Sequence, residues 1–161
     1  MFPTGRIRLV ALLAALVLAA VAAPSASASR HSGTTFQTKL LRQINLARTT
    51  NGLRPLHVNR ALGHAAQQYS NELAGLRTLS HISPNGATPE DRAAAAGYHG
   101  TYIGENLAVG MGPVMTVRAW MASPGHRANL LNPAFHVVGL GAAAGVFGPE
   151  LTVYVTADFG G

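Results

Sequence analysis

The last third of the chain carries a strand pattern, and this pattern restricts the fold more than any other feature of the 161 residues. Leu151, Val153 and Val155 alternate with polar residues, which is typical of a strand with one buried face. Residues 136–141 form a second candidate strand, and residues 148–150 supply a turn. Helical patterns dominate the sequence before these two candidate strands. This order predicts an α+β fold in which helices cover an antiparallel sheet.

Four helices and a short fifth one are expected before the hairpin. Residues 35–50 repeat apolar positions at helical spacing and end at Asn51-Gly52. Asn59 can cap a second helix, and Thr88 followed by Pro89 starts a third. The fourth runs from Val114 to about Ser123. Ser123 can then cap a short helix that begins at Pro124.

A secretory signal peptide is predicted at residues 1–28. Arg6 and Arg8 precede an apolar run over residues 9–23, and the small residues that follow offer a cleavage site of the A-x-A type. This run is shorter than the roughly 20 residues that a membrane-spanning helix needs. We therefore expect a mature chain that begins near Ser29 and keeps no transmembrane segment.

The composition of the mature chain narrows its possible partners. Without Arg6 and Arg8, ten Lys and Arg face six Asp and Glu, and these charges are scattered singly. Nucleic-acid binding needs a clustered basic stripe, so we expect no nucleic-acid partner. The chain has no cysteine, which excludes disulfides and thiol catalysis. We predict an exported monomer with a short polar tail over 29–36 and one domain over 37–161, held together by core packing.

Residues 120–131 hold the densest group of unusual side chains. They include the only tryptophan, Trp120, which we expect to be buried between the fourth helix and the sheet. His126 falls in the first turn of the short helix, where the positive end of the helix dipole favours a neutral imidazole. Such an imidazole can accept a proton or bind a metal, although a purely structural role is the simpler alternative.

Three residues are candidates for chemistry: His81, Glu105 and His126, each in or beside a loop. Two histidines and one carboxylate are the minimum set for a metal site with open positions or for acid–base catalysis. Their spacing alone does not place them in one site. The HExxH and GxSxG motifs of common hydrolases are absent from the sequence. Glycines 139, 141 and 145 are typical of a strand that another backbone approaches closely.

Several segments together resemble the bacterial branch of the CAP superfamily, also called the SCP domain. This superfamily groups cysteine-rich secretory proteins, antigen 5 and pathogenesis-related 1 proteins. The resemblance covers roughly residues 40–159, and the segments that carry it are Ser80–Gly86, Asp91-Arg92, Ala96–Tyr98, Gly104–Ala108, Trp120–Leu131 and Gly139–Gly141. It implies an α-β-α sandwich with a central three-stranded antiparallel sheet covered by helices.

The resemblance also implies an open cavity lined by two histidines and two acidic residues. His81 and His126 match the histidines and Glu105 matches the first acid, whereas Ser123 stands where animal and plant members have the second acid. A serine hydroxyl supplies no charge to a cation. His81 and His126 are therefore expected to bind a divalent metal such as zinc only weakly. Asn106 is expected beside the cavity, unless its amide serves to satisfy backbone groups.

The family resemblance implies no single shared reaction. We predict a secreted binding module for a lipid, a glycan or a surface protein, with no required cofactor. The alternative is a metal-assisted hydrolase or peptidase that uses Glu105 as its base. The missing second acid and the absent nucleophile motif disfavour that alternative.

Overall fold

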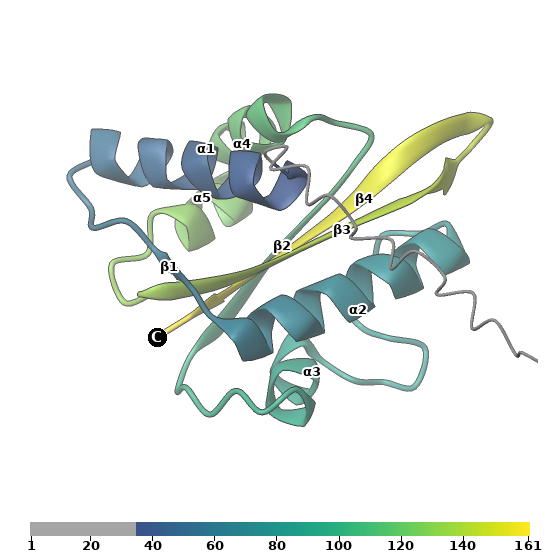
Figure 1. Ribbon diagram of the computed structural model, residues 1–161, viewed down its shortest axis with the longest axis horizontal. Helices are drawn as coiled ribbons and strands as arrows, with labels where there is room; N and C mark the ends of the chain where they lie inside the picture. Colours follow the sequence, from purple (N-terminus) through teal and green to yellow (C-terminus); the bar gives the residue numbers. More distant parts are fainter. Residues whose placement is uncertain (1–34) are drawn as a thin grey trace, which may run out of the picture. The chain divides into compact units, whose positions relative to one another are not determined.

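The computed structural model describes residues 35–161, so the predicted signal peptide and most of the predicted polar tail lie outside the described residues. The described part forms five helices and four strands (Figure 1). In chain order these are α1 (Phe36–Thr50), β1 (His57–Val58), α2 (Arg60–Leu76), α3 (Pro89–Ala95), β2 (Ile103–Val109), α4 (Pro113–Ala122), α5 (Pro124–Leu130), β3 (Val137–Phe147) and β4 (Glu150–Gly160).

The strands form one mixed sheet in the order β1-β3-β4-β2. β4 is antiparallel to both β2 and β3, while β1 pairs in parallel with the start of β3. The predicted α+β class is confirmed, but the prediction of three strands is wrong by one. The additional strand has only two residues, His57 and Val58, which is too short to show an alternating pattern in the sequence. Pro55 keeps the chain extended just before it.

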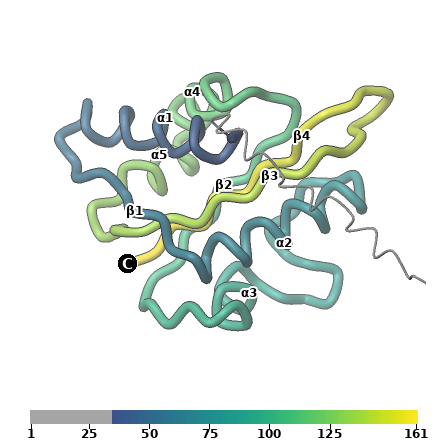
Figure 2. The backbone as a smooth tube through the Cα atoms, viewed as in Figure 1, coloured from purple at the N-terminus to yellow at the C-terminus, as the bar shows by residue number. Residues whose placement is uncertain are grey.

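Helices cover both faces of the sheet. α1, α4 and α5 lie on one face and α2 and α3 on the other, as the ribbon and the backbone tube both show (Figures 1 and 2). The main core on the α1 side contains Leu40, Ile44, Trp120, Leu130, Val138 and Phe159. A smaller cluster around Tyr69 and Tyr154 lies under α2.

The glycines of β3 allow α2 to pack closely on the sheet. A Cβ added at Gly139 would overlap the α2 backbone at Leu62, and one at Gly141 would overlap it at Ala66. The close approach that the glycine pattern predicts is therefore confirmed. No side chain larger than hydrogen fits at these two positions without moving the helix.

The helix starts follow the sequence signals, with one exception. The side chain of Asn59 accepts a hydrogen bond from the Leu62 N–H at 3.0 Å, and Thr88 forms a capping box with Asp91. Ser123 is the N-cap residue of α5, as predicted, but its side chain makes no capping hydrogen bond. Its hydroxyl instead lies 3.0 Å from Nδ1 of His126.

Trp120 is buried between α4 and the sheet, as predicted. Its indole Nε1–H donates a hydrogen bond of 2.9 Å to the carbonyl of Leu107 in β2. The ring therefore both fills the core and fixes α4 against β2.

Within residues 35–161, no helix is long and apolar enough to cross a membrane.

Candidate functional site

The candidate site is built on β2, which lies at one end of the strand order and pairs only with β4. Glu105 and Asn106 are consecutive on this strand, so their side chains point to opposite faces of the sheet. Glu105 contacts residues on the α3 side, and Asn106 contacts α5. The edge strand β2 thus places Glu105 on one face of the sheet and Asn106 on the other.

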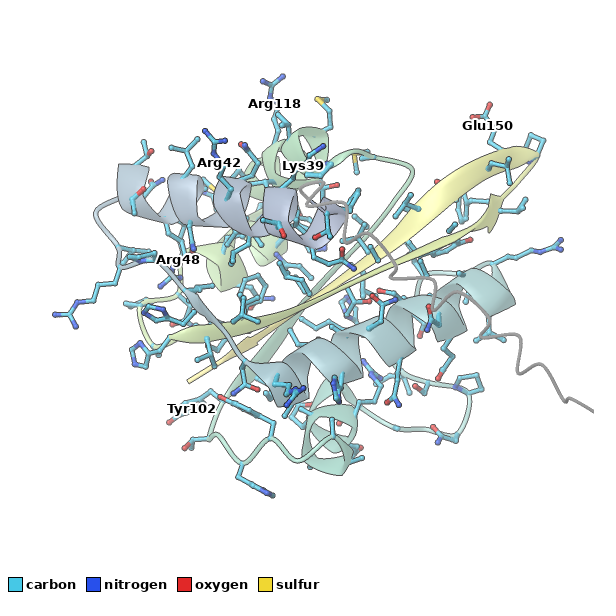
Figure 3. The ribbon with its side chains drawn as sticks, in the orientation of Figure 1. Lys39, Arg42, Arg48, Tyr102, Arg118 and Glu150 are labelled. Carbon is cyan, nitrogen blue, oxygen red and sulfur yellow. The ribbon has the colours of Figure 1, made fainter. Side chains whose placement is uncertain are left out.

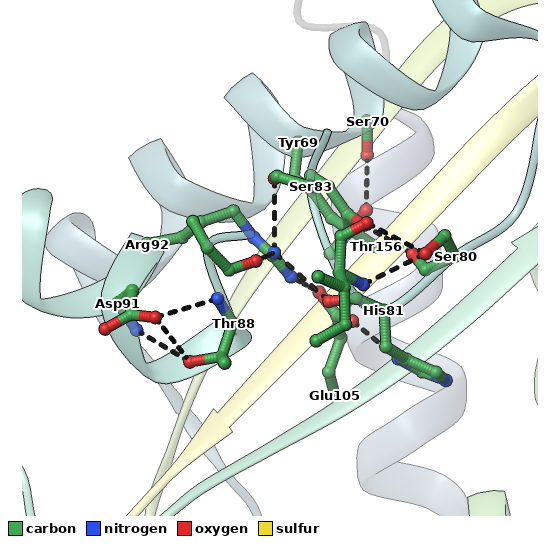
Figure 4. A network of polar contacts seen from close by, with 12 residues as sticks. Tyr69, Ser70, Ser80, His81, Ser83, Thr88, Asp91, Arg92, Glu105 and Thr156 are labelled. Atoms are coloured by element: carbon green, nitrogen blue, oxygen red, sulfur yellow. Dashed lines mark hydrogen bonds and ion pairs between the residues drawn. The ribbon is translucent and has the colours of Figure 1, made fainter. Parts of the chain in front are cut away.

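Both carboxylate oxygens of Glu105 are occupied (Figure 4). Oε1 lies 2.6 Å from Nδ1 of His81, and Oε2 accepts a bond of 2.6 Å from Nη2 of Arg92. The Glu105 side chain is only 1% exposed. Short charge-assisted contacts of this kind are among the strongest hydrogen bonds in proteins. They hold the Glu105 carboxylate in one orientation.

Arg92 connects Glu105 to the loop that carries His81. Its guanidinium lies 3.4 Å above the centre of the Tyr69 ring, a cation–π contact. Its Nη1 donates to the carbonyls of Ala87 at 2.9 Å and of His81 at 3.2 Å. The Tyr69 hydroxyl in turn donates to the carbonyl of Ser80. Arg92 therefore fixes both the acid and the backbone of the histidine that contacts it.

His81 is oriented with one ring nitrogen inward and the rest of the ring half exposed; 54% of its side chain is accessible. A carboxylate at Nδ1 favours the tautomer that carries its proton there. In that tautomer Nε2 keeps its lone pair. In its neutral form, His81 therefore presents an acceptor nitrogen that Glu105 holds in place.

A second acid lies directly behind Glu105. Asp158 of β4 is the cross-strand partner of Glu105 and is 1% exposed. Its Oδ1 has no hydrogen-bond partner within residues 35–161. Burial, followed by the negative charge of Glu105, raises the pKa of Asp158 well above its ordinary value. Burial also raises the pKa of Glu105, against the opposing effects of His81 and Arg92. Of the two acids, Glu105 is the one whose charged form its neighbours stabilise, since Arg92 and His81 contact Glu105 and not Asp158.

His126 lies on the other side of β2, in the first turn of α5. Its Nδ1 faces the Ser123 hydroxyl, and its ring centre is 6.4 Å from that of Trp120. Burial lowers the pKa of His126, and so does the positive charge that His81 carries when it is protonated. The direction agrees with the neutral imidazole expected from the sequence, but the causes differ. Burial and His81 lower the pKa of His126, whereas the sequence led us to expect that the helix dipole would do so.

The Asn106 side chain links β2 to α5 through buried hydrogen bonds and presents no exposed group to a ligand. It is fully buried, and its Nδ2 donates to the carbonyl of His126 at 3.0 Å. Asn129 of α5 donates from its own Nδ2 to Oδ1 of Asn106 at 2.9 Å and to the Glu105 carbonyl at 3.1 Å. These bonds tie both the first and the last turn of α5 to β2. Asn106 thereby takes the backbone-satisfying role that was its alternative in the sequence.

A cavity of about 300 Å³ adjoins His126. Ser123 and His126 supply its polar side chains, and the rest of its lining is apolar: Leu79, Leu107, Ala108, Val109, Met111, Ala119 and Trp120. His81 and Glu105 are not part of this lining. The structure thus pairs His81 with Glu105 and Ser123 with His126, and ties both pairs to β2. Within residues 35–161, no hydrogen bond or ion pair joins one pair to the other.

The donor set does not fit a catalytic metal centre. No three His, Asp or Glu side chains of residues 35–161 are grouped as metal ligands. Both oxygens of Glu105 are engaged, so Nε2 of His81 and Nε2 of His126 are the nitrogens left for a cation. Catalytic zinc sites use three protein ligands. Two imidazoles are consistent with weak binding at most.

Sequence reasoning missed three residues that shape this site: Tyr69, Arg92 and Asp158. Arg92 falls within a family-like segment, which was the available signal, because it lies 13 residues from Glu105 in the sequence. Asp158 is an acid in a strand that is otherwise apolar or uncharged from Leu151 onward, which also marks it as unusual. Nothing in the sequence pattern of α2 distinguishes Tyr69 from the other apolar residues of its buried stripe.

Comparison with known proteins agrees with this architecture. The uncharacterized protein YkwD of Bacillus subtilis (strain 168) is 35% identical over 107 residues, which are 66% of this chain and 42% of that protein. The uncharacterized membrane protein YlbC of the same strain is 29% identical over 110 residues, which are 67% of this chain and 32% of YlbC. The chain therefore spans less than half the length of these curated relatives.

Two solved structures are similar in both fold and sequence. One is an extracellular protein containing a SCP domain from Bacillus anthracis, with a TM-score of 0.66 and 27% identity over 76% of this chain and 39% of that chain. The other is an outer surface protein from Borrelia burgdorferi, with a TM-score of 0.67 and 26% identity over 80% of this chain and 94% of that chain. Residues 41–159 match the sequence profile of the Cysteine-rich secretory protein family, CAP. Although it contains no cysteine, the chain belongs to the CAP family, as a bacterial member with an SCP domain.

Proposed function

We propose that this domain is an extracellular binding module rather than an enzyme. The proposal rests on the contacts of the Glu105 carboxylate, whose two oxygens are bound by His81 and Arg92 at 2.6 Å each. A general base must offer a free oxygen within reach of the proton that it removes. Glu105 offers none. Its contacts support a role in positioning His81, and they argue against Glu105 as the base of the hydrolase alternative.

The cavity beside His126 supports a ligand of the lipid class. Small-molecule sites are mostly apolar, with a few polar groups that fix orientation. Here an apolar lining from β2 and α4 ends at Ser123 and His126. An acyl chain can lie along the apolar part, while its polar head accepts or donates a hydrogen bond at His126. This arrangement suits a lipid better than a glycan, because few polar groups line the cavity.

Tryptophan fluorescence tests this proposal directly, since Trp120 is the only tryptophan and lines the cavity. We expect laurate, a twelve-carbon amphiphile, to change the emission of the purified protein in a saturable way. His126→Ala should weaken the apparent affinity about tenfold, the effect of losing about 1.4 kcal/mol at the polar head. His64→Ala is the matched control, because His64 is exposed on α2. An unchanged emission, or equal losses in both variants, would refute the lipid assignment.

We further propose that the chain is exported and cleaved near Ser29. The signal-peptide pattern at residues 1–28 supports this, as does the extracellular or surface location of the two similar structures. N-terminal sequencing of protein from the culture medium should give Ser29 or a neighbouring residue. Recovery of a membrane-bound chain that still begins at Met1 would contradict the proposal.

A further inference from the structure

A second cavity, of about 610 Å³, lies at the carboxyl end of α1, and its lining contains basic but no acidic side chains. All of its titratable lining residues are basic: Arg48, Arg54, His57 and His136. No aspartate or glutamate lines it. This cavity shares no residue with the one beside His126. Neither the family match nor the proposed binding function assigns it a role.

Arg48 brings a buried positive charge to this cavity without a matching acid. Its side chain is among the largest fully enclosed ones of residues 35–161, and the residue is only 2% exposed. The guanidinium donates to four backbone carbonyls at 2.8–3.1 Å, those of Arg54, Leu130, Asn132 and Phe135. The ion pairs of the described residues both involve Glu105 and none involves Arg48. Arginine keeps its proton in proteins, so this charge is not removed by deprotonation.

The hydrogen bonds of Arg48 leave one donor unused. A guanidinium has five N–H groups. Nε donates once, Nη1 twice and Nη2 once in the bonds above, so one Nη2–H has no acceptor among residues 35–161. The carbonyls that surround the group carry only partial negative charges. Arg48 lines the cavity, so an anion held there would supply its missing countercharge.

The other basic groups of the cavity are exposed and close to one another. The backbone N–H of His57 donates to the His136 carbonyl at 3.1 Å, which joins the two backbones where β1 meets the start of β3, and both residues line the cavity. Arg54 is exposed on the loop that leads into β1. The three helices on this face of the sheet, α1, α4 and α5, contain no acidic residue. In Figure 3, Arg48 lies on the sheet side of α1, away from Arg42 and Arg118.

We propose that this cavity, which we call the Arg48 cavity, binds an oxyanion of the phosphate class. The exposed Arg54 can form bidentate hydrogen bonds with phosphate oxygens, whereas Arg48 has one N–H left. Together with His57 and His136, these groups offer more donors than the two oxygens of a carboxylate can use. A phosphate also neutralises more than one positive charge. The phosphate is either a free ion or the group of a larger molecule such as a lipid head.

Equilibrium dialysis of the purified protein against inorganic phosphate at low ionic strength tests the proposal. We expect saturable binding that Arg54→Gln and His136→Gln each weaken at least about fivefold. Arg48 itself is not replaced, because it holds four carbonyls and its loss would disturb the fold. Arg118→Gln is the matched control, since it removes one exposed charge from α4 outside the cavity. Far-ultraviolet circular dichroism verifies that each variant is folded.

Three results would overturn the proposal: no saturable phosphate binding, equal weakening in Arg118→Gln, or acetate that competes as well as phosphate. Vesicles of phosphatidylglycerol distinguish the two sources of the anion. If wild type cosediments with them and Arg54→Gln does not, the phosphate of a lipid head occupies the cavity. If both proteins behave alike with vesicles while free phosphate still distinguishes them, the cavity selects a soluble phosphate.

Discussion

Replacing Arg92 by methionine is the sharpest test of how the candidate site is held together. The change keeps the length and the apolar stem of the side chain but removes the cation that contacts Glu105 at 2.6 Å. Glu105 is 1% exposed, so it would be left as a buried carboxylate with His81 as its remaining partner. Removing one partner of a buried ion pair typically costs about 3–5 kcal/mol. Loss of the contact with the Tyr69 ring adds about 0.5–1 kcal/mol.

This cost is a large part of the roughly 5–15 kcal/mol by which small domains are stable, so urea unfolding followed by circular dichroism measures it readily. The double variant Arg92→Met/Glu105→Gln separates the buried charge from lost packing. It should be more stable than Arg92→Met alone, because no unpaired carboxylate remains. A single-variant cost below about 1 kcal/mol, or a double variant whose cost equals the sum of the two singles, would refute the reasoning.

Four further predictions follow from the described contacts. Burial and the Glu105 charge raise the pKa of Asp158 above its unfolded value, so its contribution to stability falls as the pH rises from about 4. Asp158→Asn should therefore increase the free energy of unfolding at pH 7, and the gain over wild type should shrink at pH 4.5 in urea unfolding. Gly141→Ala should cost at least about 1–3 kcal/mol by pushing α2 from the sheet, which thermal unfolding can measure. Trp120→Ala should cost about 3–5 kcal/mol in the same assay, and a cost near zero would contradict its burial. In calorimetry, zinc should bind weakly and less at pH 5.5 than at pH 7.5; His126→Ala should reduce this binding and Ser123→Glu should increase it.

Local signals predicted most of the helices and their ends. The caps at Asn59 and Thr88 act through hydrogen bonds to residues three positions away, so the information is contained in a few consecutive residues. The alternation in residues 151–156 likewise predicted β4 from its own sequence. β1 escaped prediction because two residues give no period, and its existence depends on pairing with β3 far along the chain.

The site was predictable only in part, for a related physical reason. Residue types and the family resemblance brought attention to His81, Glu105, Ser123 and His126. The role of Arg92 depends on α3 packing against the loop before it, and the effect of Asp158 depends on the register of β4 against β2. Neither is a local property of the sequence. The same holds for Ser123. From the sequence, its hydroxyl could cap α5 or bond to His126, and only the folded structure shows that it bonds to His126.

Nitrogen-15 NMR of the histidine side chains tests the central claim most directly, that a lipid binds beside His126 while Glu105 holds His81 in place. The ring nitrogens report the tautomer of each imidazole, and the purified protein is titrated with laurate. We expect the His126 signals to shift saturably, with the dissociation constant that Trp120 fluorescence gives. His81 should carry its proton on Nδ1 throughout the titration, and His64 should stay unchanged. Unshifted His126 signals, shifts of equal size at His64, or a His81 proton on Nε2 would contradict the account.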